Sequence, residues 1–456
     1  MTSSLDTSIF PSSGPVVVGH ANAVAQSEEI AYQVLKQRIH QTLIESLDLM
    51  SAKGQTPEQL QQQVQPFIDQ HVANESARDP LPESVQARLK AELPDEMFGA
   101  GPLEALMNDP AIADILVNHP HEVFVERNGL LERSHIIFAD QAHLLRIIRR
   151  IAANVGRRID EVSPMVDARL EDGSRVNAVI PPLALDGPKL SIRRFGHGHL
   201  HLDKLVAKQT LSNSMAEFLK CIVAGRNSIM ISGGTGSGKT TMLNALSAFV
   251  PVNERIVTIE DSAELRLQHP HVARLETRPA NSEGAGEFSQ RDLVKNALRM
   301  RPDRIIVGEI RGEESLDMLQ AMNTGHEGSL TTIHANDTMD ALARLEMMVA
   351  MTGLDLPTKV VRSYITSGIH FVIHVARLKG GVRKVTRISE LEKSFDGELK
   401  LNDVFEFQST GTNEAGQAIG KFVATGHRPA CMNRLAEYGI DFDDAWFISG
   451  PEEGRR

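Results

Sequence analysis

Apolar side chains between residues 28 and 93 recur at three- and four-residue steps, the spacing of an amphipathic helix. Pro57 and Pro80 stand where two further helices would begin, since proline is favoured in the first helical turn. We therefore expect a helical N-terminal domain of three short helices over residues 27–94. Residues 1–26 are rich in Ser, Pro and Ala without a period, which predicts a disordered tail.

Residues 95–205 carry short patterns of both strand and helix type instead of a series of helical periods. Strand-like runs occur at 112–117, 122–126 and 131–138, and a helical period covers 144–155. Asp172-Gly173 stands between two further strand-like runs, which is a hairpin signal. These patterns predict a separate α+β domain.

From residue 206 to residue 456, short apolar runs alternate with helical periods, as in a mostly parallel sheet covered by helices on both faces. The runs that predict buried strands are 229–231, 255–259, 304–307 and 330–333. Ser214 and Glu217 fit a capping box for a helix that ends near Gly225. The predicted fold class is α/β, with the ligand at the carboxyl edge of the sheet.

The strand predicted at 229–231 runs into a glycine-rich loop with the spacing Gly, four residues, Gly-Lys-Thr. The loop and the start of the next helix comprise Gly233, Gly234, Thr235, Gly236, Ser237, Gly238, Lys239, Thr240 and Thr241. Glycines let successive backbone N–H groups turn toward one point, and the helix adds its positive end. The pattern predicts binding of ATP or GTP, with Lys239 on phosphate oxygens and Thr240 on Mg²⁺.

Acidic and histidine side chains end three of the predicted strands. Glu260 and Glu264 follow the strand at 255–259, and a carboxylate near a γ-phosphate can orient and deprotonate the attacking water. Glu309 follows the next strand, but Gly308 stands where P-loop proteins usually carry an Asp, so Glu309 is expected to act on Mg²⁺ through water or to polarise the nucleophile. His334 follows the strand at 330–333, where it can hydrogen-bond the γ-phosphate.

Four blocks of the chain resemble, in the right order, the Walker A, Asp box, Walker B and His box of the secretion ATPase superfamily, which drives type II and type IV secretion and type IV pili. The blocks are 233–241, 258–264, 304–311 and 325–336. Other segments look like those of the tight-adherence (Flp) pilus ATPases of CpaF type. These segments are 98–103, 125–129, 172–177 and 191–195.

The resemblance implies a hexameric ATPase that pairs a PAS-like domain over 95–205 with a RecA-like domain over 206–456, the ATP lying between them. It assigns Lys239 to the β- and γ-phosphates, Glu309 to the Walker B role and His334 to γ-phosphate sensing. Either Glu260 or Glu264 is implied to act on the water, and the choice between them stays open.

Three upstream arginines are candidates to complete such a site. A guanidinium brought to the γ-phosphate from another domain or subunit neutralises transition-state charge. The candidates are Arg175, Arg193 and Arg194.

Composition narrows the possible partners. The 456-residue chain carries 48 basic and 59 acidic residues, a formal net charge of −11, and 4% aromatic residues, so no direct nucleic-acid contact is expected.

Cys221 and Cys431 fit neither a metal site nor a disulfide framework, which suits a reducing cytoplasm. No segment approaches the ~20 apolar residues of a membrane span. We expect a cytoplasmic protein held peripherally at the inner membrane by platform proteins, with the pilin contacted indirectly.

Three other features are interpreted as structural. The run from His197 to His201 is expected to be a solvated interdomain linker rather than a metal site, and the glycine-rich tract 410–420 a loop. A group of methionines is expected to pack in the core rather than to form a partner surface. These are Met318, Met322, Met347, Met348 and Met351.

The leading hypothesis is an ATP-hydrolysing motor that turns nucleotide-driven rotation of its two domains into pilus assembly or retraction. A type IV secretion or conjugation ATPase that exports protein or DNA shares the same core. A DNA-translocating motor is disfavoured by the acidic balance and the scarcity of aromatic residues. A nucleotide-gated scaffold with little turnover is compatible with Gly308.

Overall fold

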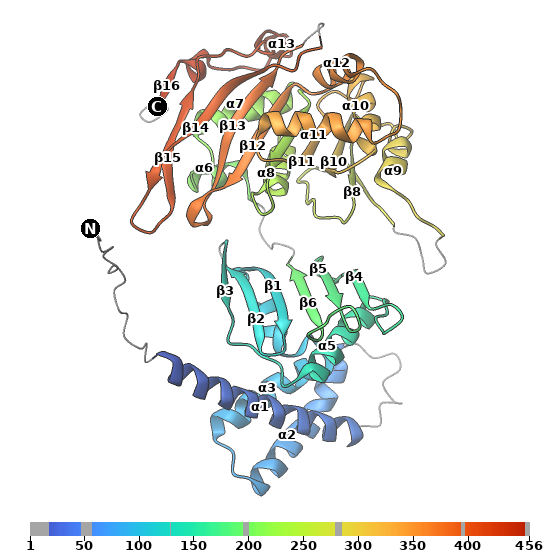
Figure 1. Ribbon diagram of the computed structural model, residues 1–456, viewed down its shortest axis with the longest axis vertical. Helices are drawn as coiled ribbons and strands as arrows, with labels where there is room; N and C mark the ends of the chain where they lie inside the picture. Colours follow the sequence, from blue (N-terminus) through green and yellow to red (C-terminus); the bar gives the residue numbers. More distant parts are fainter. Residues whose placement is uncertain are drawn as a thin grey trace, which may run out of the picture. The chain divides into compact units, whose positions relative to one another are not determined.

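The computed structural model describes residues 18–46, 57–127, 129–194, 200–278, 285–393 and 397–451 (Figure 1). The chain divides into two units, Met1–Phe195 and Gly196–Arg456. Each unit builds its own apolar cores.

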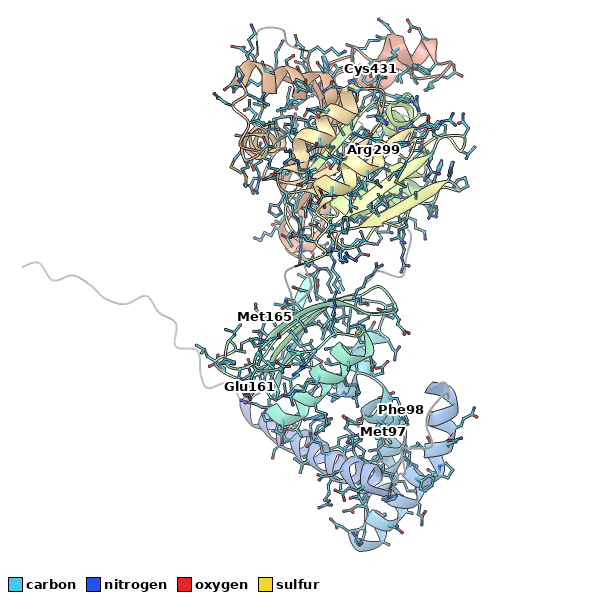
Figure 2. The ribbon with its side chains drawn as sticks, turned by 90° about the vertical axis from the view of Figure 1, so that its right-hand side faces the viewer. Met97, Phe98, Glu161, Met165, Arg299 and Cys431 are labelled. Atoms are coloured by element: carbon cyan, nitrogen blue, oxygen red, sulfur yellow. The ribbon has the colours of Figure 1, made fainter. Side chains whose placement is uncertain are left out.

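Three helices open the first unit: α1 (Val18–Ser46), α2 (Pro57–Arg78) and α3 (Glu83–Phe98). Their shared core is formed by apolar side chains from all three helices, including Leu43, Ile68, Val72, Leu89 and Leu93. Met97 and Phe98, at the end of α3, pack against this core (Figure 2).

The start of α3 differs from the expectation at Pro80. The helix begins at Glu83, directly after Pro82. A proline pushes the residue before it out of the helical region, so Pro82 excludes a helix that starts earlier.

A six-stranded antiparallel sheet follows in the order β3-β2-β1-β6-β5-β4. Its strands are β1 (Ile112–His119), β2 (Glu122–Arg127), β3 (Leu130–Arg133), β4 (Met165–Arg169), β5 (Arg175–Val179) and β6 (Lys189–Arg193). The short turns η2 (Gly101–Leu103) and α4 (Glu104–Met107) precede it, and helix α5 (Gln141–Asn154) shares its core. The Asp172-Gly173 hairpin is confirmed, because β4 and β5 pair on either side of it.

The third strand is shorter than predicted. β3 ends at Arg133, and the backbone N–H of Phe138 donates to the carbonyl of Pro120 rather than to a neighbouring strand. Ile136 and Phe138 are nonetheless buried in the core. The apolar character of 134–138 therefore reflects core packing of an irregular segment, which a period-2 pattern does not distinguish from a strand.

Glu96 of α3 connects the three helices to the sheet region. Its carboxylate accepts from Nε2 of His143 on α5 at 3.0 Å and lies 3.2 Å from Nζ of Lys36 on α1. The guanidinium of Arg150, also on α5, donates to the Glu96 carbonyl. Burial alone would raise the pKa of Glu96, but His143 and Lys36 outweigh it and lower that pKa to about 2.

The second unit contains a ten-stranded sheet in the order β16-β15-β14-β13-β12-β7-β11-β10-β8-β9. The parallel strands are β7 (Ile229–Gly233), β8 (Ile256–Glu260), β9 (Val272–Glu276), β10 (Arg304–Ile310), β11 (Leu330–His334) and β12 (Phe371–Arg377). The antiparallel strands are β13 (Arg383–Leu391), β14 (Leu401–Thr412), β15 (Ala418–Ala424) and β16 (Gly450–Pro451).

Helices cover both faces of the parallel strands (Figure 1). They are α6 (Leu202–Ala207), α7 (Asn213–Ala224), α8 (Lys239–Ser247), α9 (Gln290–Ala297), α10 (Glu314–Asn323), α11 (Thr338–Ala350) and α12 (Thr358–Gly368). Smaller elements are η3 (Lys379–Gly381), α13 (Met432–Glu437) and η4 (Asp444–Phe447). Ile229 and Ile231 join one core while Met230 joins the other, as expected where successive strand residues point to opposite faces. The predicted α/β fold class is confirmed.

Two predictions of secondary structure in this unit are wrong. The capping residue of α7 is Ser212, whose side chain accepts from the N–H of Met215, so Ser214 lies inside the helix. The tract 410–420 is largely strand rather than loop, because β14 and β15 pair through it and leave only 413–417 as a turn. Glycine is needed at position 420, where β15 lies close to the backbone of β14, since a Cβ there would lie 2.3 Å from the carbonyl oxygen of Gln408.

None of the helices in the part of the chain that the structure describes has both the length and the apolar character of a membrane span.

Candidate nucleotide site

The glycine-rich loop joins β7 to α8 at the carboxyl edge of the parallel strands. Gly236 has φ +68° and Gly238 has φ +104°, conformations that glycine adopts without strain. A Cβ on Gly233 would lie 2.2 Å from the carbonyl oxygen of Val375 and 2.5 Å from Oγ of Ser237. The loop therefore requires glycine for backbone conformation at two positions and for space at a third.

Lys239 is the first residue of α8, and its side chain extends back over the loop toward Gly233 and Gly234. Its Nζ donates to the carbonyl oxygens of Gly233 at 3.0 Å and Gly234 at 3.2 Å, and it lies 3.7 Å from Oε1 of Glu309. Burial lowers the pKa of Lys239, and the charge of Glu309 opposes that effect. The predicted phosphate-binding lysine and the predicted Walker B glutamate are thus brought together.

Glu309 also contacts a residue that sequence reasoning did not single out. Nε of Arg311 donates to Oε2 of Glu309 at 2.8 Å, and Nη1 of Arg311 reaches Oδ2 of Asp261 at 3.3 Å. Arg311 lies within the block that resembles Walker B, so its place in that block was the available signal.

Glu260 ends β8 and is only 3% exposed. Its Oε2 accepts from the backbone N–H groups of Glu264 at 2.6 Å and Leu265 at 2.7 Å. Its Oε1 is buried and has no hydrogen-bond partner among the described residues. Burial raises the pKa of Glu260, while the two N–H groups oppose that rise. Glu264 is half-buried on the loop that Glu260 holds.

His334 and the two threonines lie at the same edge. The register of β11 against β7 pairs His334 with Gly233, the first residue of the loop. Thr240 and Thr241 are half-buried in the first turn of α8. Oγ1 of Thr332 donates to the carbonyl of Gly308 at 2.7 Å, which ties β11 to β10 beside Glu309.

The three candidate arginines belong to the first unit. Arg175 and Arg193 are paired residues of β5 and β6, and Nε of Arg193 donates to Oδ1 of Asp114 at 3.1 Å. Arg194 is 8% exposed, and its guanidinium donates to the carbonyls of Asp109 and Ile112. The buried contacts of Arg194 fix the end of β6 in place. The role of all three toward a nucleotide stays a prediction.

The histidine run and the methionine group differ in how far they match the expectation. His197 and His199 lie outside the described residues, and His201 directly precedes α6. The described ranges contain no cluster of three or more His, Cys, Asp or Glu suited to a metal ion. Met318, Met322 and Met348 are buried as expected, whereas Met347 and Met351 are exposed.

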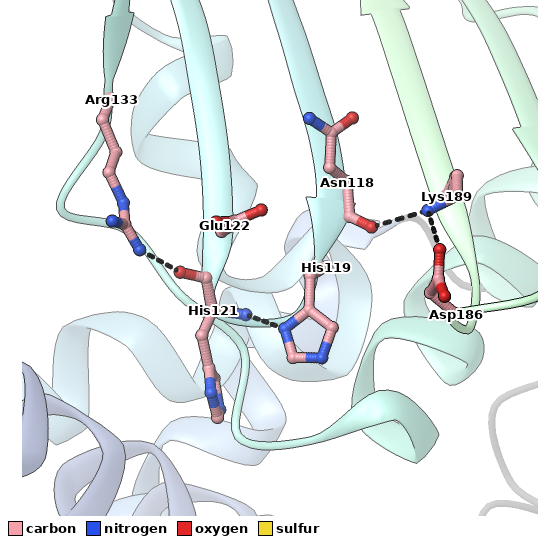
Figure 3. A pocket seen from close by; sticks show the side chains of 7 residues that line it. All are labelled: Asn118, His119, His121, Glu122, Arg133, Asp186 and Lys189. Carbon is pink, nitrogen blue, oxygen red and sulfur yellow. Dashed lines mark hydrogen bonds and ion pairs between the residues drawn. The ribbon is translucent and has the colours of Figure 1, made fainter.

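A concavity in the first unit surrounds the turn from β1 to β2 (Figure 3). Its basic side chains already have partners: Arg133 donates to the carbonyl of His121, and Lys189 donates to the carbonyl of Asn118. The N–H of His121 donates to Nδ1 of His119. The concavity therefore offers no comparable convergence of catalytic groups.

Known proteins similar to this chain belong to secretion or conjugal transfer systems. The family described as "Type II/IV secretion system protein" matches residues 96–418. A Mycobacterium tuberculosis (strain H37Rv) protein named "Putative conjugal transfer protein" is 41% identical over 308 residues, 66% of this chain and 87% of that protein. The conjugal transfer protein TrbB of Rhizobium radiobacter is 31% identical over 294 residues, 63% of this chain and 85% of that protein. The crystal structure of the VirB11 ATPase from the Brucella suis type IV secretion system, in complex with sulphate, is 29% identical, covers 63% of this chain and 91% of its own, and gives a TM-score of 0.35.

Proposed function

The chain belongs to the type II/IV secretion system protein family, and we propose that it is an ATP-hydrolysing motor that powers pilus assembly or retraction at the cytoplasmic face of the inner membrane. The observation that carries the proposal is the convergence of Lys239, Glu309 and Glu260 at one edge of the sheet, from the start of α8 and from two strands far apart in sequence.

The donor set of this edge fits a nucleotide with Mg²⁺. The loop has the glycine conformations that turn N–H groups toward a phosphate, and Lys239 lies beside the loop. Lys239 would hold the β- and γ-phosphates, and Mg²⁺ would be held by Thr240 and, through water, by Glu309. Mg²⁺ bound there would neutralise charge that develops on the phosphate oxygens. His334 hydrogen-bonds the γ-phosphate and senses its presence.

Of the two candidate bases, Glu260 has the stronger support. Its Oε2 is occupied by two backbone N–H groups, which fix the carboxylate, while Oε1 has no partner among the described residues. A fixed carboxylate whose pKa is raised by burial is a stronger base than an exposed carboxylate, which suits proton abstraction from water. Glu264 contributes charge on the same loop.

The motor activity requires more than one unit and more than one subunit. In the proposed hexamer, Arg175, Arg193 and Arg194 supply positive charge to the ATP, and the unit of the chain that carries these arginines is not the unit that carries the loop. Binding, hydrolysis and release then change the angle between the units, which the ring passes to inner-membrane platform proteins.

A second function has support of its own. Two of the relatives named above are conjugal transfer proteins, which favours a type IV secretion or conjugation ATPase with the same chemistry and a different cargo. A nucleotide-gated ring with little turnover is the third candidate.

Phosphate release from ATP by the purified full chain tests the enzymatic part. We expect Mg²⁺-dependent release that Lys239→Ala abolishes while the variant keeps its far-ultraviolet circular dichroism spectrum, because several kcal/mol of transition-state stabilisation are lost. Wild-type turnover in Lys239→Ala contradicts the site, and no release by the wild type favours the gated ring.

Deletion of the gene tests the biological part. Loss of surface pili in electron micrographs, restored by the wild-type gene and not by the Lys239→Ala form, supports the pilus motor. Intact pili with loss of conjugal transfer support the second candidate.

A further inference from the structure

The hairpin formed by β12 and β13 lies directly beside the phosphate loop. β12 pairs with β7 as far as His374 and Ser232, whose Nδ1 and Oγ are 2.9 Å apart. Beyond that pair, β7 turns into the loop, and the backbone of Val375 approaches Gly233 too closely for any Cβ. The loop therefore begins in contact with β12.

Two arginines at the end of this hairpin reach the tip of the loop. Arg377 ends β12, Arg383 begins β13, and the two are paired in the register. Nε of Arg383 donates to the carbonyl oxygen of Gly236 at 2.9 Å. A Cβ on Gly236 would lie 3.4 Å from Nη1 of Arg377, and a Cβ on Gly238 would lie 3.6 Å from Cδ of Arg383.

The hairpin is itself held in place. The N–H of Leu378 donates to the carbonyl of Val382 at 2.7 Å, which closes the turn. A Cβ on Gly380 would lie 2.7 Å from Cα of Gln417, so the turn also packs against the one between β14 and β15. The antiparallel strands thereby support the side chains that reach the loop.

Because a phosphate loop binds by aiming its N–H groups inward, its carbonyl groups need a fixed direction as well. The carbonyl of Gly236 and the N–H of Ser237 belong to one planar peptide group, so a bond that holds the carbonyl also sets the direction of the N–H. The N–H of Ser237 makes a long bond of 3.3 Å to the carbonyl of Gly234, which it can exchange for a phosphate oxygen.

We infer that Arg383 is a positioning residue that holds the phosphate loop in its nucleotide-binding conformation, and that Arg377 adds positive charge at the tip of the loop. The inference rests on the proposed function only in that the loop binds a nucleotide; it does not require hydrolysis. Arg383 acts on the nucleotide through the Gly236–Ser237 peptide group.

Three variants of the full chain separate this role from a merely structural one. Arg383→Ala removes the donor, and Arg383→Lys keeps a cation that can reach a carbonyl. Lys379→Ala is the control, because Lys379 is an exposed cation of the same hairpin. Binding of ADP with Mg²⁺ is measured by isothermal titration calorimetry, KM and kcat by phosphate release, and folding by the unfolding midpoint without nucleotide.

Arg383→Ala is expected to weaken ADP binding and raise KM about tenfold, which corresponds to about 1.4 kcal/mol, because the loop loses a hydrogen bond from a charged donor. Its kcat should fall less than its KM rises, its unfolding midpoint without nucleotide should stay within about 2 °C of the wild type, and Arg383→Lys should recover most of the lost affinity. Lys379→Ala should bind like the wild type.

Wild-type affinity and KM in Arg383→Ala overturn the inference, as does an equal loss in Lys379→Ala. A chain that binds ADP normally but releases no phosphate contradicts the motor while the binding data still decide the role of Arg383. A wild-type chain that binds no nucleotide overturns both.

Discussion

Gly308 of β10 and Glu260 of β8 share one point of the sheet edge: a Cβ on Gly308 would lie 3.1 Å from Cγ of Glu260. Most Cβ atoms do not tolerate so short a contact, and Glu260 cannot move away because two backbone N–H groups hold its carboxylate. An Asp side chain at position 308 of β10 would therefore need the space that the side chain of Glu260 on β8 occupies. Glycine at position 308, where an Asp was expected from the sequence, leaves room for the carboxylate of the neighbouring strand.

Replacing Gly308 tests this relationship. Gly308→Asp should cost about 1–3 kcal/mol of unfolding free energy through overpacking, and it should abolish phosphate release because a second carboxylate raises the pKa of Glu260 further. Gly308→Ala should lose less unfolding free energy and less phosphate-release activity than Gly308→Asp. Urea unfolding and phosphate release measure the two effects, and a fully active Gly308→Asp chain would show that Glu260 has room to move.

Separate amide substitutions distinguish the two candidate bases. Glu260→Gln should lower kcat by about 10²–10⁴-fold, the range expected for loss of a general base, while ADP still binds because the loop is untouched. Glu264→Gln should lower kcat by less than tenfold, roughly the scale of a nearby charge. The opposite ranking in phosphate-release assays would transfer the role of base to Glu264.

The pH dependence of turnover should carry the signature of a buried base. Because burial raises the pKa of Glu260, and the base acts only when ionised, the acid limb of the kcat profile should lie above the ordinary carboxyl value of about 4.5. The check is kcat as a function of pH at saturating ATP. An acid limb at or below the ordinary carboxyl range would contradict a buried base.

The ion cluster around Glu96 predicts a pH-dependent stability in the first unit. The folded pKa of about 2 lies below the ordinary value of 4.5, so between these pH values the unfolded chain binds more protons and stability falls as pH falls. At pH 7, Glu96→Gln should cost about 3–5 kcal/mol, because it leaves the buried Lys36 without its full counter-charge.

The control for that cluster is Glu83→Gln, an exposed glutamate in the first turn of the same helix. Its effect on guanidinium unfolding should stay within about 0.5 kcal/mol. Equal effects of the two substitutions would show that the cluster contributes no special stability. Since the family match begins at Glu96, the cluster joins the three N-terminal helices to the matched part of the chain.

The sequence by itself determined the elements whose signals are local. The strand before Gly233, the loop and the helix that starts at Lys239 follow from apolar runs and glycine spacing, and parallel strands bring Glu260, Glu309 and His334 to the same edge. The α/β fold class and the Asp172-Gly173 hairpin follow from patterns of the same short range.

Only the tertiary structure decided which distant strands lie side by side. Nothing near Arg383 in the sequence shows that its side chain contacts the phosphate loop. That contact with Gly236 depends on β12 pairing with β7 and on β13 pairing with β12. The relationship of Gly308 to Glu260 likewise depends on β10 lying next to β8. Local patterns report which face of an element is buried, whereas strand order is set by packing across the whole sheet.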